Sequence, residues 1–185
     1  MKKIILLGDS IRLIGYGKKV PELLGENYKV WQPTDNCRFA QYTLRMLFDY
    51  RKELEGADII HWNNGLWDAC DLFDDGSFTP LETYAETLLR IAGILQKYAK
   101  KVIFATTTPV DPANPHDHNE IIARYNAFVT PKLEEIGVMI DNLHSVVCPH
   151  IDTYICEDHL HLSEAGINAC AKAVVESIKK AEELI

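Results

Sequence analysis

Two short segments near opposite ends of the 185-residue chain carry side chains that could act together in nucleophilic catalysis. Gly8-Asp9-Ser10 follows an apolar run near the start, and Asp158 precedes His161 by three residues near the end. A serine hydroxyl becomes an effective nucleophile only when a nearby base removes its proton, and histidine suits that role because it titrates near neutral pH. A carboxylate on the other ring nitrogen fixes the tautomer of that histidine. We therefore expect Ser10 as nucleophile, His161 as base and Asp158 as the group that orients the base.

Short apolar runs alternate with longer amphipathic stretches along the chain, and this pattern predicts a parallel sheet covered by helices. Strands are expected at residues 3–7, 28–31, 59–62, 102–106 and 138–141. Helices are expected at residues 38–54, 79–99, 119–136 and 163–185. Thr79 and Ser163 are the expected N-caps, and Pro131 predicts a kink or a break. The alternation implies right-handed βαβ units within one α/β domain that spans residues 1–185.

Polar side chains follow four of these predicted strands. They lie in residues 8–10, 32–38, 63–68 and 107–110. Ligands of open parallel sheets bind beyond the carboxyl ends of the strands. We therefore expect these four segments to gather around one crevice, with the serine of the first segment facing it.

The two end segments resemble the first and last blocks of the SGNH/GDSL hydrolases, a family of serine esterases and lipases. Gly8-Asp9-Ser10 after an N-terminal strand is similar to the first block, and Asp158-x-x-His161 before Leu-Ser-x-x-Gly is similar to the last. The resemblance covers about residues 4–166. It implies a flavodoxin-like three-layer sandwich with a five-stranded parallel sheet, and a Ser-His-Asp triad at the positions named above. The GxSxG elbow of the α/β-hydrolases is missing around the serine, which disfavours that other fold.

The middle of the chain departs from the family pattern at the groups that would stabilise an oxyanion. The second block normally supplies a glycine N–H, but residues 35–38 contain no glycine, so the N–H of Cys37 is the expected replacement. The third block is normally Gly-x-Asn-Asp, whereas residues 65–68 read Gly-Leu-Trp-Asp. Asn64, at the end of a strand, or its neighbour Asn63 is the expected substitute. The N–H of the nucleophile should contribute on either assignment.

Four side chains near these loops bear on the substrate. Arg12 and Arg38 could clamp a carboxylate through paired hydrogen bonds, and Trp62 and Trp67 could pack on sugar rings. Structural roles remain open for all four, because arginines commonly form surface ion pairs and tryptophans commonly fill cores. Taken together, these four side chains favour, as the substrate, an acetyl or other short acyl ester of a carbohydrate or of a similar polar small molecule.

The composition limits the classes of partner. A net charge of −8 speaks against a nucleic-acid or anionic-membrane surface. The five cysteines include no CxxC pair, and His116, Asp117 and His118 with Asp111 form an incomplete ligand set, so no metal or cofactor is expected. The apolar run at residues 4–7 is too short for a secretory signal. We expect a cytoplasmic protein with a small-molecule ester substrate, and self-association stays open.

Two other functions deserve comparison with the esterase. A non-catalytic small-ligand-binding protein on the same fold is the main alternative, because the second and third blocks are irregular. A flavin or nucleotide binder would need a glycine-rich loop after the first strand. Residues 8–12 contain a single glycine and an aspartate, which ranks that function last.

Overall fold

The computed structural model describes residues 1–185, and its centre is a five-stranded parallel sheet. The strands are β1 (Lys2–Leu7), β2 (Tyr28–Trp31), β3 (Ala57–Asn63), β4 (Ala99–Ala105) and β5 (Met139–Asp141). Their order is β2-β1-β3-β4-β5, which is the flavodoxin-like arrangement. β1 and β3 are adjacent at the point where the order of strands reverses, so the crevice for a ligand is expected between their carboxyl ends.

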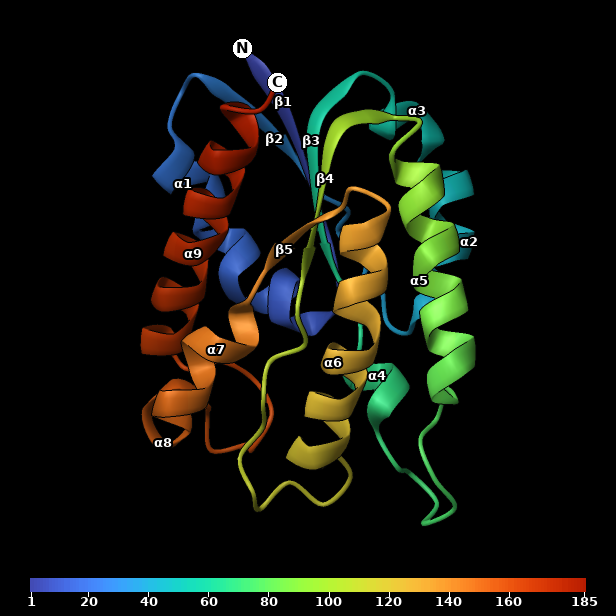
Figure 1. Cartoon of the computed structure of the whole chain (residues 1–185). Coiled ribbons are helices and arrows are strands. Elements are labelled where there is room, and N and C mark those ends of the chain that lie inside the picture. The colour runs from blue at the N-terminus through green and yellow to red at the C-terminus, as the bar shows by residue number, and fades with distance from the viewer.

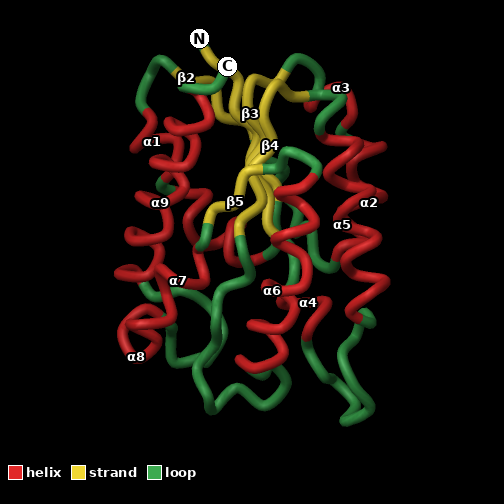
Figure 2. The backbone as a smooth tube through the Cα atoms, in the orientation of Figure 1, coloured by secondary structure: helices red, strands yellow, loops and turns green.

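Helices cover both faces of the sheet and make a three-layer sandwich (Figures 1 and 2). One layer contains α1 (Val20–Leu24), α7 (Leu143–Val147), α8 (Ile151–Tyr154) and α9 (Glu164–Glu182). The other layer contains α2 (Ala40–Asp49), α3 (Arg51–Leu54), α5 (Leu81–Leu95) and α6 (Asn119–Glu135). The short helix α4 (Leu66–Ala69) follows β3 directly. The longest loops gather at the carboxyl end of the sheet, opposite the two chain termini (Figure 2).

The central strands are apolar on both faces because each face meets a layer of helices. Residues 4–7 of β1 are at most 2% exposed, and β3 is almost fully buried along its length. Continuous apolar runs are the expected pattern for parallel strands in this setting. No helix of the structure combines the length and the apolar composition that a membrane crossing requires.

The expected five strands and four long helices are present, but the helix expected at residues 38–54 is divided into α2 and α3, and two other details differ. Ser163 caps α9 as expected, since its Oγ accepts the N–H of Gly166 at 3.2 Å. Thr79 does not cap α5, which begins two residues later; its N–H is instead bonded to the backbone of Asp68. α6 continues past Pro131 to Glu135 without a break, so the packing of its buried face outweighs the missing N–H of the proline.

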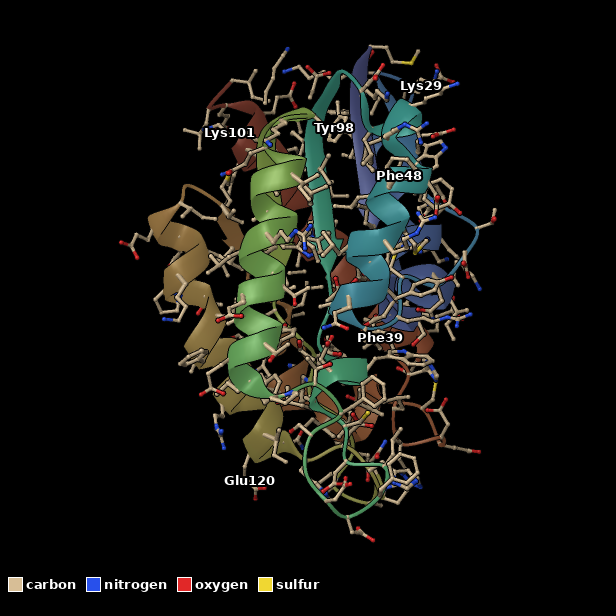
Figure 3. All side chains as sticks on the ribbon, turned by 90° about the vertical axis from the view of Figure 1, so that its right-hand side faces the viewer. Lys29, Phe39, Phe48, Tyr98, Lys101 and Glu120 are labelled. Carbon is tan, nitrogen blue, oxygen red and sulfur yellow. The ribbon has the colours of Figure 1, made fainter.

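A buried carboxylate marks the beginning of α2. Phe39, at the end of α2 nearest the loop cluster (Figure 3), occupies the N-cap position but supplies no side-chain cap. The Asp68 carboxylate, which comes from α4, accepts the N–H of Ala40 at 3.0 Å and 3.2 Å. Burial raises the pKa of Asp68 to about 7, although hydrogen bonds from Thr79 and Ala40 oppose that rise. The two helices are thus joined by a group that holds a proton when an ordinary aspartate would not.

We expect this proton to make the stability of the fold depend on pH. The unfolded chain releases it near pH 4, whereas the folded protein keeps it until about pH 7. The free energy of unfolding contributed by Asp68 is therefore fully present below about pH 4 and is lost as the pH rises toward 7. In urea titrations, the free energy of unfolding of the wild type should fall by about 2–3 kcal/mol more than that of Asp68→Asn as the pH rises from about 4.5 to about 7.5.

The quantity to compare is the slope of unfolding free energy against pH, because the substitution also changes the absolute value. Asp75→Asn serves as the control, since Asp75 is exposed in a surface loop. Parallel slopes for the wild type and Asp68→Asn would show that Asp68 titrates like an ordinary aspartate.

Candidate active site

The structure brings Ser10, His161 and Asp158 into one hydrogen-bonded chain. His161 Nε2 lies 2.9 Å from Ser10 Oγ, across 151 residues of sequence, and His161 Nδ1 lies 2.7 Å from Asp158 Oδ2. Ser10 stands three residues after the end of β1, at the N-cap of a single π-helical turn. His161 stands in the loop before α9. This is the spacing that proton transfer from a serine to an imidazole requires.

Asp158 is held in its orienting position by the backbone of its own loop. Its Oδ1 accepts the N–H of Leu160 at 3.0 Å and that of His161 at 2.9 Å. Partial burial would raise the pKa of Asp158, but these bonds and the His161 ring outweigh it and lower that pKa to about 2. The carboxylate is therefore ionised at neutral pH. It can accept a hydrogen bond from a protonated Nδ1 of His161, which leaves Nε2 free to take the serine proton.

The loop that carries the histidine is closed by backbone pairing. The N–H of Cys156 donates to the carbonyl of His161 at 2.7 Å, and Ile155 pairs antiparallel with Leu162. The loop is then tied to α8, because Ser163 Oγ donates to the carbonyl of Thr153 at 2.7 Å. Two short connections thus limit the freedom of the imidazole before any ligand arrives.

The serine turn rests on a buried polar cluster. Asp9 Oδ1 accepts the N–H of Ile11 at 2.9 Å and the amide of Asn63 at 2.8 Å. Tyr16 donates its hydroxyl to Asn63 Oδ1 at 2.8 Å. Burial raises the pKa of Asp9, against the lowering effect of the Asn63 and Ile11 hydrogen bonds. Asn63 therefore supports the turn from beneath, and its side chain is engaged by Asp9 and Tyr16 in place of the substrate contact that the sequence suggested.

Gly8 is required by this cluster. Its φ is +156°, and a Cβ at this position would lie 1.9 Å from Asn63 Oδ1. A side chain at residue 8 would therefore displace the asparagine that holds the nucleophile turn in place.

The other two expected oxyanion donors are also occupied. Asn64 is fully buried and donates its amide to the carbonyl of Arg38 and to Thr43 Oγ1, both at 2.9 Å. The N–H of Cys37 donates to the carbonyl of Gly8 at 3.1 Å, and the Cys37 sulfur accepts the N–H of Gly8 at 3.2 Å. The predicted roles for these two donors therefore do not agree with the geometry.

Arg38, instead of Cys37, has the backbone conformation typical of glycine in this loop. Its φ is +50°, in the left-handed region that non-glycine residues adopt infrequently. Nothing in the sequence indicates this conformation, because an arginine does not predict it. The hydrogen bonds of the serine turn involve the N–H groups of Ile11 and Leu13, and the oxyanion role of the Ser10 N–H stays a prediction.

Arg12 has a structural role and does not clamp a ligand as the sequence suggested. Its side chain is fully buried, and its guanidinium donates to the carbonyls of Pro33, Gly8 and Asp35 at 2.8 Å, 3.0 Å and 2.8 Å. It thereby fastens the serine turn to the loop that follows β2. Arg38 is exposed, and its guanidinium lies 4.7 Å from the centre of the Tyr42 ring.

A pocket of about 380 Å³ opens beside Ser10, within the usual size of small-molecule sites. Its walls are largely apolar and come from α4, the loop after it, the loop before α6 and the histidine loop. They include Leu66, Trp67, Leu72, Leu160, Asn114 and Asp117. Trp62, the other tryptophan considered for sugar packing, is fully buried against Phe104 and lies in the core.

The loop at residues 114–117 was missed as part of the site. In the sequence, His116 and Asp117 stand out only as members of an incomplete ligand set, and nothing there shows which side chains of this loop line the pocket beside the serine. Burial raises the pKa of Asp117 to about 6, although His116 and His118 act to lower it. These residues belong to no cluster of three or more side chains that could hold a metal ion.

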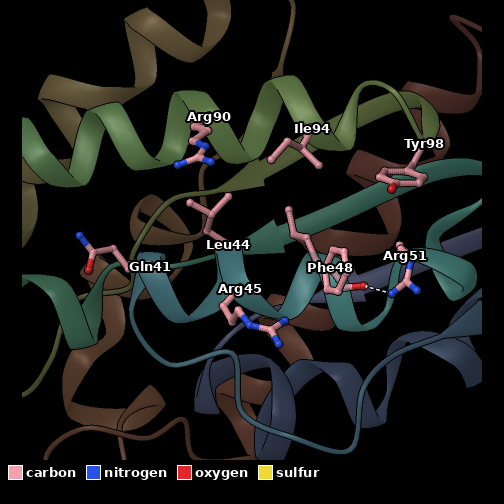
Figure 4. A pocket seen from close by; sticks show the side chains of 9 residues that line it. Gln41, Leu44, Arg45, Phe48, Arg51, Arg90, Ile94 and Tyr98 are labelled. Carbon is pink, nitrogen blue, oxygen red and sulfur yellow. Dashed lines mark hydrogen bonds between the residues drawn. The ribbon is translucent and has the colours of Figure 1, made fainter.

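A second hollow of about 420 Å³ lies between α2 and α5 (Figure 4). Leu44, Phe48, Ile94 and Tyr98 form its apolar part. Arg45, Arg51 and Arg90 also line it, and the first two lie over the Phe48 ring at 5.5 Å and 4.4 Å. None of the three hydrogen-bonded residues at the serine lines this hollow.

Solved structures with the same architecture support the fold over the whole chain. A lipase/acylhydrolase from Enterococcus faecalis is 22% identical, with a TM-score of 0.79 over 97% of this chain and 96% of that one. An acetylxylan esterase from Geobacillus stearothermophilus is 17% identical, with a TM-score of 0.78 over 96% and 94%. Another acetyl xylan esterase is 17% identical, with a TM-score of 0.74 over 97% and 98%. No family model and no curated protein matches the sequence. The chain has the SGNH hydrolase fold.

The buried guanidinium of Arg12 leads to a prediction about stability. Replacing Arg12 by methionine removes a donor from the carbonyls of Pro33, Asp35 and Gly8. The Gly8 carbonyl keeps the N–H of Cys37, but the other two lose their donor, and each acceptor left unsatisfied costs about 1–3 kcal/mol. Arg12→Met should therefore lower the free energy of unfolding by about 3–5 kcal/mol in a chemical denaturation experiment. Arg38→Met is the matched control, and it should change that free energy by less than about 1 kcal/mol because the side chain is exposed. Equal losses in the two variants would contradict the structural role of Arg12.

Proposed function

We propose that the protein is a serine esterase of the SGNH/GDSL type, with Ser10 as nucleophile, His161 as general base and Asp158 as the residue that orients the base. The observation that carries this proposal is the pair of hydrogen bonds at 2.9 Å and 2.7 Å that links the three side chains. The serine also borders a pocket of suitable size. A protein that only bound its ligand would have no need for this connected arrangement.

The reaction would proceed in two stages. His161 Nε2 takes the proton of Ser10 Oγ as that oxygen bonds to the ester carbonyl carbon, and the N–H of Ser10 donates to the developing oxyanion. The ester C–O bond then breaks, and the imidazolium gives its proton to the departing alcohol. In the second stage His161 takes a proton from water, whose oxygen attacks the acyl-enzyme. The acid leaves and Ser10 recovers its proton, while Asp158 stabilises the imidazolium throughout.

We further propose a short acyl ester, in particular an acetyl ester, of a carbohydrate or other polar small molecule as substrate. Two of the structural neighbours are named as acetylxylan esterases. Catalytic mutants of one of them replace a serine or an aspartate by alanine, the residue types that this chain places on either side of His161. The exposed face of Trp67 in the pocket also suits a sugar ring.

Substitutions in the hydrogen-bonded chain test the mechanism. Ser10→Ala should reduce hydrolysis of p-nitrophenyl acetate to the background rate, because the nucleophile is gone. Asp158→Asn should lower kcat by about 10²–10⁴-fold, because an amide favours the wrong imidazole tautomer. The measurement is steady-state kinetics, with thermal unfolding to show that each variant remains folded.

His159→Asn is the control for loss of a neighbouring histidine. The His159 side chain faces Asp111, with Nδ1 3.4 Å from Asp111 Oδ1, so activity should stay near that of the wild type. A fluorophosphonate probe should label the wild type at Ser10 and fail to label Ser10→Ala. Full activity in Ser10→Ala, or labelling at another residue, would refute the mechanism.

A further inference from the structure

The pocket beside Ser10 contains one carboxylate that the proposed mechanism does not use. Asp117 lies in the loop between β4 and α6 and lines this pocket. Asn114 Oδ1 accepts the N–H groups of His116 and Asp117 at 2.9 Å and 2.8 Å, and the N–H of Asp71 donates to the carbonyl of His116 at 2.8 Å. The position of Asp117 is therefore fixed by the loop backbone, independently of its own side chain.

The protein supplies no hydrogen-bond donor to this carboxylate. Asp117 Oδ1 is shut off from water and has no partner, and the residue lines the pocket beside the serine. The polar neighbours are used elsewhere: Cys70 donates to the carbonyl of Trp67, and Asn114 donates to that of His159, both at 3.3 Å. No lysine or arginine lines the pocket. An acceptor in this state is costly unless something else provides a donor.

The rest of the pocket indicates which donor would fit. Leu66, Leu72 and Leu160 make the walls apolar, and Trp67 leaves 42% of its surface exposed. Apolar and aromatic walls with an unpaired acceptor suit a ring that has C–H groups on its face and hydroxyl groups on its edge. A ligand with its own carboxylate would meet Asp117 and Asp158 and no lysine or arginine.

We propose that Asp117 is a specificity residue that accepts a hydrogen bond from a sugar hydroxyl of the ester that Ser10 attacks. This inference rests on the esterase function proposed above and defines its substrate class: esters whose sugar carries a free hydroxyl near the acetyl group, with the ring against Trp67. Uncharged and hydroxyl-bearing substrates are favoured over uronic acid esters.

The test compares substrates that differ by one hydroxyl group. The probes are methyl 2-O-acetyl-β-D-xylopyranoside and its two monodeoxy analogues, which lack the hydroxyl at carbon 3 or carbon 4. The quantity measured is the ratio of kcat/KM for the hydroxyl-bearing ester to that for each analogue. This ratio is taken within one protein preparation, so it does not depend on the fraction of active enzyme.

We expect a ratio of about tenfold or more in the wild type for one of the analogues, since a hydrogen bond to a charged acceptor contributes this much. Asp117→Ala should bring that ratio close to one. Asp117→Asn should give an intermediate value, because the amide oxygen still accepts but has no charge. Asp75→Asn removes a charge from the nearby surface loop, outside the pocket, and should retain the wild-type ratio.

The outcomes separate this inference from the function on which it rests. Suppose that the wild type hydrolyses p-nitrophenyl acetate in a Ser10-dependent manner, but the ratio is the same in the wild type, Asp117→Asn and Asp117→Ala. The role of Asp117 is then wrong, and the esterase function stands. If the wild type hydrolyses none of the esters and Ser10 takes no fluorophosphonate label, the esterase function fails and the inference fails with it.

Discussion

The hydrogen bond between Ser10 Oγ and His161 Nε2 is the contact on which the site depends, and it joins residues 151 positions apart. Neither segment could hold this geometry alone. β1 fixes the serine at the carboxyl edge of the sheet, and α9 returns beside the sheet in the layer that also contains α1 (Figure 1). The fold thus supplies what the proposed reaction needs most, which is the proximity of two groups that no local structure could bring together.

Polar groups buried beneath the site maintain this geometry. Asp9, Asn63 and Tyr16 form one connected set under the serine turn, and Arg12 connects that turn to the next loop. Asp68 joins α4 to the start of α2. Burial of such groups contributes little stability and can reduce it. These groups cluster at the carboxyl end of the sheet, beside the serine and histidine. We infer that their hydrogen bonds make the site rigid and that the fold gives up some stability for it.

The site departs from the family pattern in a consistent direction. A tryptophan, Trp67, stands where the third block normally has asparagine, and Asn63 and Asn64 are both committed to internal contacts. The position therefore contributes an apolar wall to the pocket instead of a hydrogen-bond donor. Asp117, Trp67 and the leucines that line the pocket all come from loops and a short helix at the carboxyl end of the sheet, and loops of this kind commonly carry function on a common fold.

The sequence by itself determined the parallel α/β sheet, since continuous apolar runs and amphipathic helices follow from local pattern. It also indicated the three residues of the proposed triad, because Gly8-Asp9-Ser10 and Asp158-x-x-His161 are contiguous motifs. It could not determine how Asn63, Asn64, Cys37 and Arg12 are used. Each of these residues could equally face a ligand or a buried carbonyl, and composition and spacing are the same in both cases. The left-handed backbone at Arg38 and the unpaired carboxylate of Asp117 likewise appear only when loops distant in sequence meet. A hydrogen-bond partner is a property of three-dimensional surroundings, so only the tertiary structure could decide which polar side chains were left free for chemistry.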